Sequence, residues 1–299
     1  MKISPSKSKA ILLAAVSIAL VFVGLSFMTE VSSSKNFDGK RAFEDLLFQV
    51  ALGPRVPGTK PHADQIDWMK TSLEGFGWTV SIQESAPLGN KIYNLVAKRG
   101  EGQGGDFIIL GAHYDTRRIA DQDPVAANMS QPIPGANDGA SGVAVLMEMA
   151  RVIPRDFDKE IWLVFFDAED GFNIPGWGLS LGAQSFVEQL NRKPEAVVVV
   201  DMVGDANLEL PKDGLSNEHL VNEIWAAASN LGYEDIFRDE IGYNMLDDHS
   251  PFNEQGIPAA VIIDFNYPYW HTLADDIDKV SAASLEIVGN TLLAWLMVK

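Results

Sequence analysis

The stretch Phe107-Ile-Ile-Leu-Gly-Ala-His-Tyr-Asp115 joins an uncharged, mostly apolar run to a polar end. A short continuous apolar run indicates a strand that is buried on both faces, and such strands are typical of parallel sheets covered by helices. The same pattern recurs in three further runs: residues 161–166 before Asp167, residues 196–200 before Asp201, and residues 259–265, which lead to His271. The chain therefore has an α/β pattern.

Segments with helical spacing of apolar residues alternate with these strands, which favours a central sheet with helices on both faces. We predict one α/β domain over residues 36–299, with a twisted, mixed and mostly parallel sheet, because no repeat or linker divides this region. Helices are expected over residues 37–51, 62–76, 139–151, 182–190, 217–231 and 281–298. Strands are expected over residues 78–83, 91–98, 107–112, 160–167, 196–203 and 259–265.

The composition is that of a globular protein, with 46% apolar and 21% charged residues among 299. Lys and Arg number 23 and Asp and Glu 41, so the formal net charge is −18. This acidity excludes a nucleic-acid partner, because phosphate backbones would be repelled. The chain has no cysteine. Disulfides and thiolate chemistry are therefore excluded, and any metal must be bound by His and carboxylates.

The amino-terminal residues 1–35 have the layout of an export signal. Lys2, Lys7 and Lys9 precede an uncharged apolar run over residues 10–28, and a serine-rich polar stretch follows. The run is close to the roughly 20 residues that span a bilayer. It fits a cleaved signal peptide or a retained membrane anchor with a polar spacer. Either alternative places the protein outside the cytoplasm, secreted or anchored to the membrane by this segment.

Polar side chains gather where the predicted strands end, which is where open α/β sheets build their sites. We expect at least six carboxylates and two His to converge there, with no Lys or Arg beside them. Carboxylates packed so closely would repel one another and bind protons. A divalent cation relieves that repulsion, and His with Asp or Glu is a zinc ligand set.

These polar residues belong to motifs that resemble those of the zinc aminopeptidase superfamily, in the same order and spacing, over about residues 40–299. The motifs are His113-Tyr-Asp115, Asn137-Asp-Gly-Ala-Ser-Gly142, Phe166-Asp-Ala-Glu-Asp170, Asp247-Asp-His-Ser-Pro-Phe252 and Trp270-His-Thr272. Within the superfamily the chain is most similar to the animal-type glutaminyl cyclases, mainly through the last two motifs. The resemblance implies a zinc-aminopeptidase-like fold.

The resemblance also implies the metal ligands. Asp138, Asp170 and His271 would bind one zinc ion, which leaves a position open for water or substrate. In the aminopeptidases of the superfamily, the positions of His113 and Asp201 hold a second zinc that Asp138 bridges. The sequence leaves open whether this second site is filled.

The remaining roles are carried over in the same way. Glu169 matches the general acid/base, while Asp201 and Asp247 match an acidic pair that steadies the reacting groups. The substrate pocket would be lined by aromatic residues: Trp270, Trp177 as a displaced pocket tryptophan, and Tyr269, which fits either the pocket wall or loop packing.

Three positions differ from the animal cyclases. Asp170 stands where they have Glu, Leu246 where they have Gln, and Val261 where they have a second pocket His. The ligand type survives at Asp170, so these differences affect the cyclase assignment more than the metal site.

Other polar residues have simpler interpretations. His62 and His219 are expected on solvated helix surfaces, and Asp275 is expected to cap and solvate the last helix. We expect Arg55 to pair with a carboxylate, and His249 to orient either a loop or a carboxylate that supports the metal ligands.

The favoured function is a zinc-dependent glutaminyl-peptide cyclotransferase, a monomer with one zinc per chain, acting on peptide or protein N-termini. It would convert an N-terminal Gln to pyroglutamate and release ammonia. A di-zinc aminopeptidase is the alternative, because every hydrolytic residue is also present. A non-catalytic, receptor-like ectodomain is the third possibility, and the intact Glu169 and ligand set argue against it.

Overall fold

The computed structural model describes residues 36–100 and 106–299, and residues 36–299 form one compact unit. The predicted signal peptide or anchor lies outside the described residues. None of the helices in the described ranges combines the length and the apolar character needed to cross a membrane.

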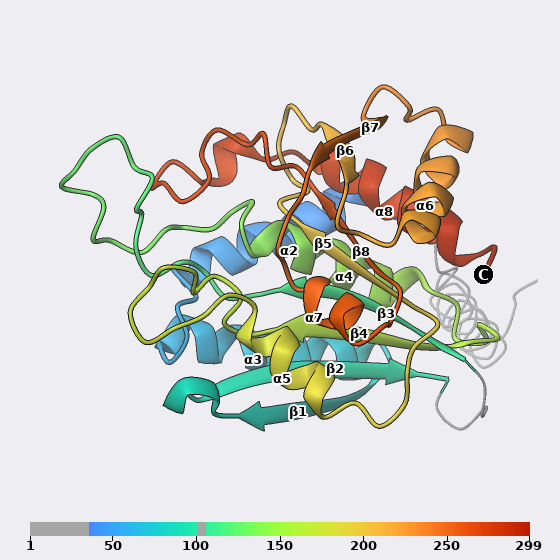
Figure 1. Ribbon diagram of the computed structural model, residues 1–299, viewed down its shortest axis with the longest axis horizontal. Helices are drawn as coiled ribbons and strands as arrows, with labels where there is room; N and C mark the ends of the chain where they lie inside the picture. The colour runs from blue at the N-terminus through green and yellow to red at the C-terminus, as the bar shows by residue number, and fades with distance from the viewer. Residues whose placement is uncertain (1–35, 101–105) are drawn as a thin grey trace, which may run out of the picture. The chain divides into compact units, whose positions relative to one another are not determined.

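A six-stranded sheet with the order β1-β2-β4-β3-β5-β8 forms the centre of the domain (Figure 1). The pairs β3–β4, β3–β5 and β5–β8 are parallel, and the pairs β1–β2 and β2–β4 are antiparallel. The predicted mixed, mostly parallel sheet is confirmed. Its strands are β1 (Thr79–Ser85), β2 (Ile92–Arg99), β3 (Phe107–His113), β4 (Glu160–Phe166), β5 (Ala196–Asp201) and β8 (Ala259–Ile263).

Successive residues of each buried strand point to opposite faces of the sheet, so both faces are apolar. Helices cover both of them. Ile108 and Leu110 of β3 belong to one core cluster, while Phe107 and Ile109 belong to another. The first cluster includes residues of α2 (Gly39–Leu52), α3 (Lys60–Gly75), α4 (Ala140–Val152), α6 (Glu218–Asn230) and α8 (Ala282–Leu296). The second includes residues of α5 (Leu181–Glu188) and α7 (Ser250–Glu254).

The start of α4 brings one predicted metal ligand to the end of β3. Gly139 has a φ of 95°, which side-chain-bearing residues rarely adopt, and a Cβ there would lie 2.3 Å from the carbonyl oxygen of Asp115. Gly142 allows an equally close approach, since its Cβ would lie 2.2 Å from the carbonyl oxygen of Val200. Small residues at the start of α4 therefore hold Asp138 against the edge of the sheet where β3 and β5 end.

A second, two-stranded parallel sheet and a short helix were not expected from the sequence. The sheet pairs β6 (Leu210–Asp213) with β7 (Phe237–Tyr243), and the helix is α7. Strand β7 reads Phe-Arg-Asp-Glu-Ile-Gly-Tyr and is mostly exposed, so it lacks the apolar run that marks the central strands. Two 3₁₀ turns, Pro87–Gly89 and Ile277–Lys279, complete the regular structure of the described residues.

Candidate metal and active site

The predicted site residues converge at the carboxyl ends of the parallel strands. His113 and Asp201 are the last residues of β3 and β5, and Asp170 follows β4. Asp138 lies just before α4, and His271 lies in the loop after β8. All five side chains are buried. The fold thus gathers at one edge of the sheet residues that are up to 158 positions apart in the chain.

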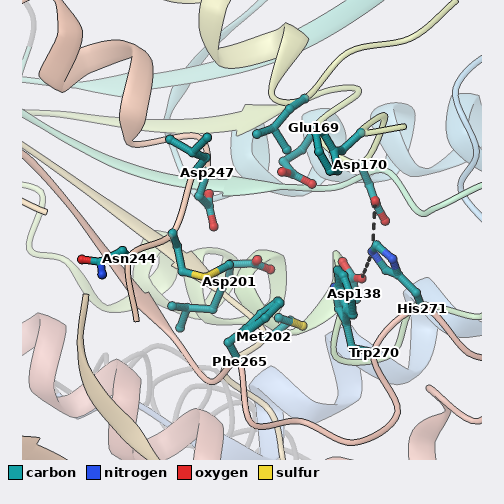
Figure 2. Close-up of a pocket in the computed structure, with 15 residues that line it drawn as sticks. Asp138, Glu169, Asp170, Asp201, Met202, Asn244, Asp247, Phe265, Trp270 and His271 are labelled. Atoms are coloured by element: carbon teal, nitrogen blue, oxygen red, sulfur yellow. Dashed lines mark ion pairs between the residues drawn. The ribbon is translucent and has the colours of Figure 1, made fainter. Parts of the chain in front are cut away.

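Two groups of potential metal ligands share Asp138. In the first, Nε2 of His271 lies 3.2 Å from Oδ1 of Asp170 and 3.6 Å from Oδ2 of Asp138 (Figure 2). In the second, Nε2 of His113 lies 3.0 Å from Oδ1 of Asp201 and 3.3 Å from Oδ1 of Asp138. Within each group the ligand atoms lie within 4.8 Å of one another, close enough to surround one cation.

Buried atoms without a hydrogen-bond partner show that the first group fits a metal ion. Oδ2 of Asp138 and Oδ2 of Asp170 are both buried without such a partner. Burial, together with the neighbouring Asp170 carboxylate, raises the pKa of Asp138. Buried acceptors that lack donors are costly unless a cation occupies the space between them. One imidazole and two carboxylates form a set that zinc accepts.

Asp275 holds the loop that carries Asp138. Its Oδ1 accepts hydrogen bonds from the backbone N–H of Asn137 (2.8 Å) and from the hydroxyl of Tyr267 (2.7 Å), and its Oδ2 accepts one from the N–H of Asp138 (3.2 Å). The expectation that Asp275 is a solvated helix cap is wrong, because the side chain is fully buried and Ser281 caps α8 instead. Burial and the nearby Asp138 raise the pKa of Asp275 to about 7.

An arginine lies among these carboxylates, contrary to the expectation that no Lys or Arg stands beside them. Nη1 of the buried Arg117 donates to Oδ1 of Asp170 over 2.8 Å. Burial alone would raise the pKa of Asp170, but His271 and Arg117 lower it. Arg117 stands two residues beyond the predicted motif His113-Tyr-Asp115, and an arginine in such a loop is ordinarily solvated.

Two further expectations are wrong because the side chains are buried. His62 is not solvated: its Nε2 lies 2.8 Å from Oδ1 of Asp167, in the core below the site. Arg55 pairs with backbone carbonyls rather than a carboxylate, donating to the oxygens of Pro134 (2.6 Å) and Gly135 (2.5 Å). Both residues support loops that lead to the predicted metal ligands.

Glu169 lies next to Asp170 and is partly buried. Its backbone N–H donates to Oδ1 of Asp115 over 3.0 Å, and the preceding Ala168 has a φ of 54°. Desolvation in this position, with Asp170 and Asp247 nearby, raises the pKa of the Glu169 carboxyl well above its usual value. A carboxyl with a raised pKa can both accept and deliver a proton near neutral pH, as a general acid/base requires.

A pocket of about 330 Å³ opens onto these residues. Its polar base is formed by Asp138, Glu169, Asp170, Asp201, Asp247 and His271. Its other walls are mostly apolar and include Phe172, Leu179, Met202, Asn244, Met245, Leu246, Ile263, Phe265 and Trp270. Most of these wall residues carry no motif, so the sequence offered little signal for them. Burial and the neighbouring Asp201 raise the pKa of Asp247 to about 7.

The three predicted pocket aromatics lie in different places. Trp270 lines the pocket and stacks on the His271 ring, with centroids 3.6 Å apart (Figure 2). Trp177 does not line this pocket, and the Arg118 guanidinium lies 4.0 Å from its ring centroid. Tyr269 is also absent from the pocket walls and packs at 5.4 Å, edge to face, against Tyr267. Of the two alternatives for Tyr269, the structure places it in loop packing.

Comparison with known proteins gives the family. The model of peptidase family M28 matches residues 94–296. The chain belongs to this family. The predicted similarity to glutaminyl cyclases is also confirmed: the chain is 22% identical to the glutaminyl-peptide cyclotransferase of Boiga dendrophila, over 90% of this chain and 83% of that protein. It is 31% identical to aminopeptidase YwaD of Bacillus subtilis over 63% of this chain, but spans only 40% of the length of YwaD.

The solved structures similar to this chain also include both a cyclase and an aminopeptidase. The glutaminyl cyclase of Porphyromonas gingivalis is 32% identical, with a TM-score of 0.82 over 88% of this chain and 98% of that one. A leucine aminopeptidase precursor from Bacteroides thetaiotaomicron is also 32% identical, with a TM-score of 0.81 over the same shares. The protein is therefore an M28-family enzyme with buried His and Asp groups suited to zinc, and its relatives include both cyclases and aminopeptidases.

Proposed function

We propose that this M28 protein is a zinc-dependent glutaminyl-peptide cyclotransferase, which converts an N-terminal Gln of peptides or proteins to pyroglutamate. One observation carries the proposal. Asp138, Asp170 and His271 all line the pocket together with Glu169, whereas His113 of the second group does not line it. The pocket thus presents one complete metal-binding group to a substrate. From the export-type segment at residues 1–35, the proposed place of action is outside the cytoplasm.

One metal group is sufficient for this reaction, because no water molecule has to be activated. The α-amine nitrogen of the substrate attacks the side-chain amide carbon, a C–N bond forms, and the amide nitrogen leaves as ammonia. Zinc held by Asp138, Asp170 and His271 would supply Lewis-acid polarisation of the amide carbonyl.

Proton transfer falls to Glu169. Its carboxylate would take a proton from the attacking amine and deliver one to the departing nitrogen, and its raised pKa suits both steps. Asp201 and Asp247, which also line the pocket base, would hold the amine and the amide by hydrogen bonds. Trp270 would wall the substrate and offer its indole N–H to a substrate carbonyl.

A second candidate function, a di-zinc aminopeptidase, is favoured by a different observation. His113 and Asp201 form a second group with the shared Asp138, and its atoms are as close as those of the first. Asp138, Asp170 and His271 would hold one metal ion and His113, Asp138 and Asp201 a second, and these ions would supply Lewis-acid activation of water, with Glu169 accepting the proton. The same base of the pocket serves both reactions.

A peptide pair separates the two functions. The full chain is incubated with a peptide that begins with Gln and a matched peptide that begins with Leu, and the products are read by mass. Loss of ammonia from the Gln peptide, with the Leu peptide unchanged, is the result expected of the cyclase. Removal of the first residue from either peptide would overturn the proposal in favour of the aminopeptidase. No reaction with either peptide would contradict both functions.

Metal analysis of the same samples supplies a second readout. The cyclase predicts close to one zinc per chain, and the aminopeptidase predicts close to two.

A further inference from the structure

The guanidinium of Arg117 makes a set of contacts that connects two metal ligands. The side chain is only 2% exposed. Nη1 donates to Oδ1 of Asp170 (2.8 Å) and approaches the backbone oxygen of the same residue (3.3 Å). Nε and Nη2 donate to the two carboxylate oxygens of Asp121 (2.7 and 2.9 Å), and Nη2 also donates to the backbone oxygen of Phe172 (3.0 Å). The arginine is therefore held rigidly on several sides.

Asp121 extends this contact set to the other of the two ligands, His271. Its Oδ1 lies 3.3 Å from Nδ1 of His271, an ion-pair distance at which Nδ1 makes no hydrogen bond, while Nε2 of the same ring faces Asp138 and Asp170. The negative charge of this carboxylate favours a proton on the outer nitrogen of the imidazole, which leaves the inner nitrogen free for the metal. Since Arg117 grips both oxygens of Asp121, it also controls where that carboxylate stands.

The contact with Arg117 gives the two carboxylate oxygens of Asp170 different surroundings. Arg117 donates to Oδ1, which also lies 3.2 Å from Nε2 of His271, whereas Oδ2 is buried without a hydrogen-bond partner. Oδ2 is thus the oxygen left available for a cation, and the carboxylate cannot rotate without breaking its bond to the guanidinium. Lysine could not replace this arrangement, because a single ammonium cannot form the fork that spans two carboxylates.

We propose that Arg117 is a positioning residue of the metal centre, which orients Asp170 directly and His271 through Asp121. The proposal goes beyond the choice between cyclase and aminopeptidase, because both reactions use these ligands. Its failure can therefore be told apart from a failure of the proposed function.

The test measures zinc affinity of the full chain by competition with a chromophoric chelator. Arg117→Lys keeps the charge and removes the fork, and we expect zinc affinity to fall by about 10- to 100-fold, as for other residues that orient metal ligands. Asp121→Asn keeps the link to Asp170 but weakens the hold on His271, so affinity should fall by about 10-fold. Arg118→Lys is the matched control, since the Arg118 guanidinium stacks on Trp177 instead of a ligand, and should leave affinity unchanged.

Cobalt substitution adds a readout of ligand geometry. The visible absorption of bound Co²⁺ should differ from wild type in Arg117→Lys and Asp121→Asn but not in Arg118→Lys. Melting of the metal-free variants detects loss of folding, and if Arg117→Lys does not fold, Asp121→Asn carries the test.

Three results would overturn the proposal. Unchanged zinc affinity and cobalt spectrum in folded Arg117→Lys would show that a point charge is enough. A lowered melting temperature with unchanged affinity would show a merely structural role. Tighter zinc binding in Arg117→Gln would show that Arg117 acts by repelling the cation instead of placing its ligands.

Discussion

Replacing Glu169 by Gln tests the chemistry of the pocket with little disturbance of the fold. The backbone of Glu169 holds the local turn: its N–H donates to Asp115 (3.0 Å), and its carbonyl accepts from the N–H groups of Gly171 and Ser180 (both 2.9 Å). Gln keeps this backbone and nearly the same side-chain volume and removes a charge that burial disfavours, so the free energy of unfolding should not fall. Since Glu169 is outside both ligand groups, zinc should remain bound.

The expected loss is in turnover. Positioned acid/base groups contribute about 10²–10⁴-fold, so kcat for the Gln peptide should fall by that factor, which corresponds to about 2.7–5.5 kcal/mol in the barrier. Ammonia release measures kcat, metal analysis measures zinc, and urea unfolding measures stability. In the wild type, kcat should decrease toward acidic pH with a midpoint above the usual pKa of Glu. This decrease should be absent in Glu169→Gln. Retention of more than about a tenth of wild-type kcat, against the minimum hundredfold loss, would refute the role of Glu169. Loss of zinc with unchanged stability would instead make it a ligand.

Three further predictions concern the ligands and the buried charges. His271→Ala removes one of the three predicted ligands, so zinc should be lost on dialysis, and full occupancy by metal analysis would contradict the assignment. His62→Ala leaves Oδ1 of Asp167 buried and unpaired, which should lower the free energy of unfolding in urea by about 2–4 kcal/mol. The exposed His219→Ala is its control, and equal effects of the two would refute the reasoning. Burial raises the pKa of Asp45 from 3.8 to about 6, so its contribution to stability is present below 3.8 and is lost as pH rises through 6. The unfolding free energy of the wild type, measured in urea with chelator, should therefore fall between pH 4 and pH 7.5. In Asp45→Asn this fall should be smaller by about 1–2 kcal/mol. The same fall in both proteins would contradict the prediction.

The central strands were predictable because each carries its own signal. A run such as residues 107–112 can bury both faces only inside a covered sheet, whatever the rest of the chain does. Strand β7 was not predictable in this way, because its exposed, charged residues have no such run and it forms only by pairing with β6. The antiparallel partners β1 and β2 were expected as strands, but their direction depends on pairing that local pattern does not encode.

The candidate metal ligands followed from the family resemblance, and the structure brings them close together. The groups that orient them were not predictable in this way. Arg117 reaches Asp170 across 53 positions, and Asp275 reaches Asn137 across 138. Polar and titratable residues in loops and on helix surfaces are solvated unless the fold buries them, so the sequence alone favoured solvent for His62 and Asp275.

The amino-acid pattern was thus sufficient for the fold class and for the residue types that meet a metal, because apolar runs and donor chemistry are local properties. Which carboxylates are paired with Arg117, which loop Asp275 holds, and which aromatic side chains wall the pocket depend on how distant loops pack at one edge of the sheet. Trp270 and Trp177 are chemically identical, and only their packing separates a pocket wall from an arginine-stacked loop residue.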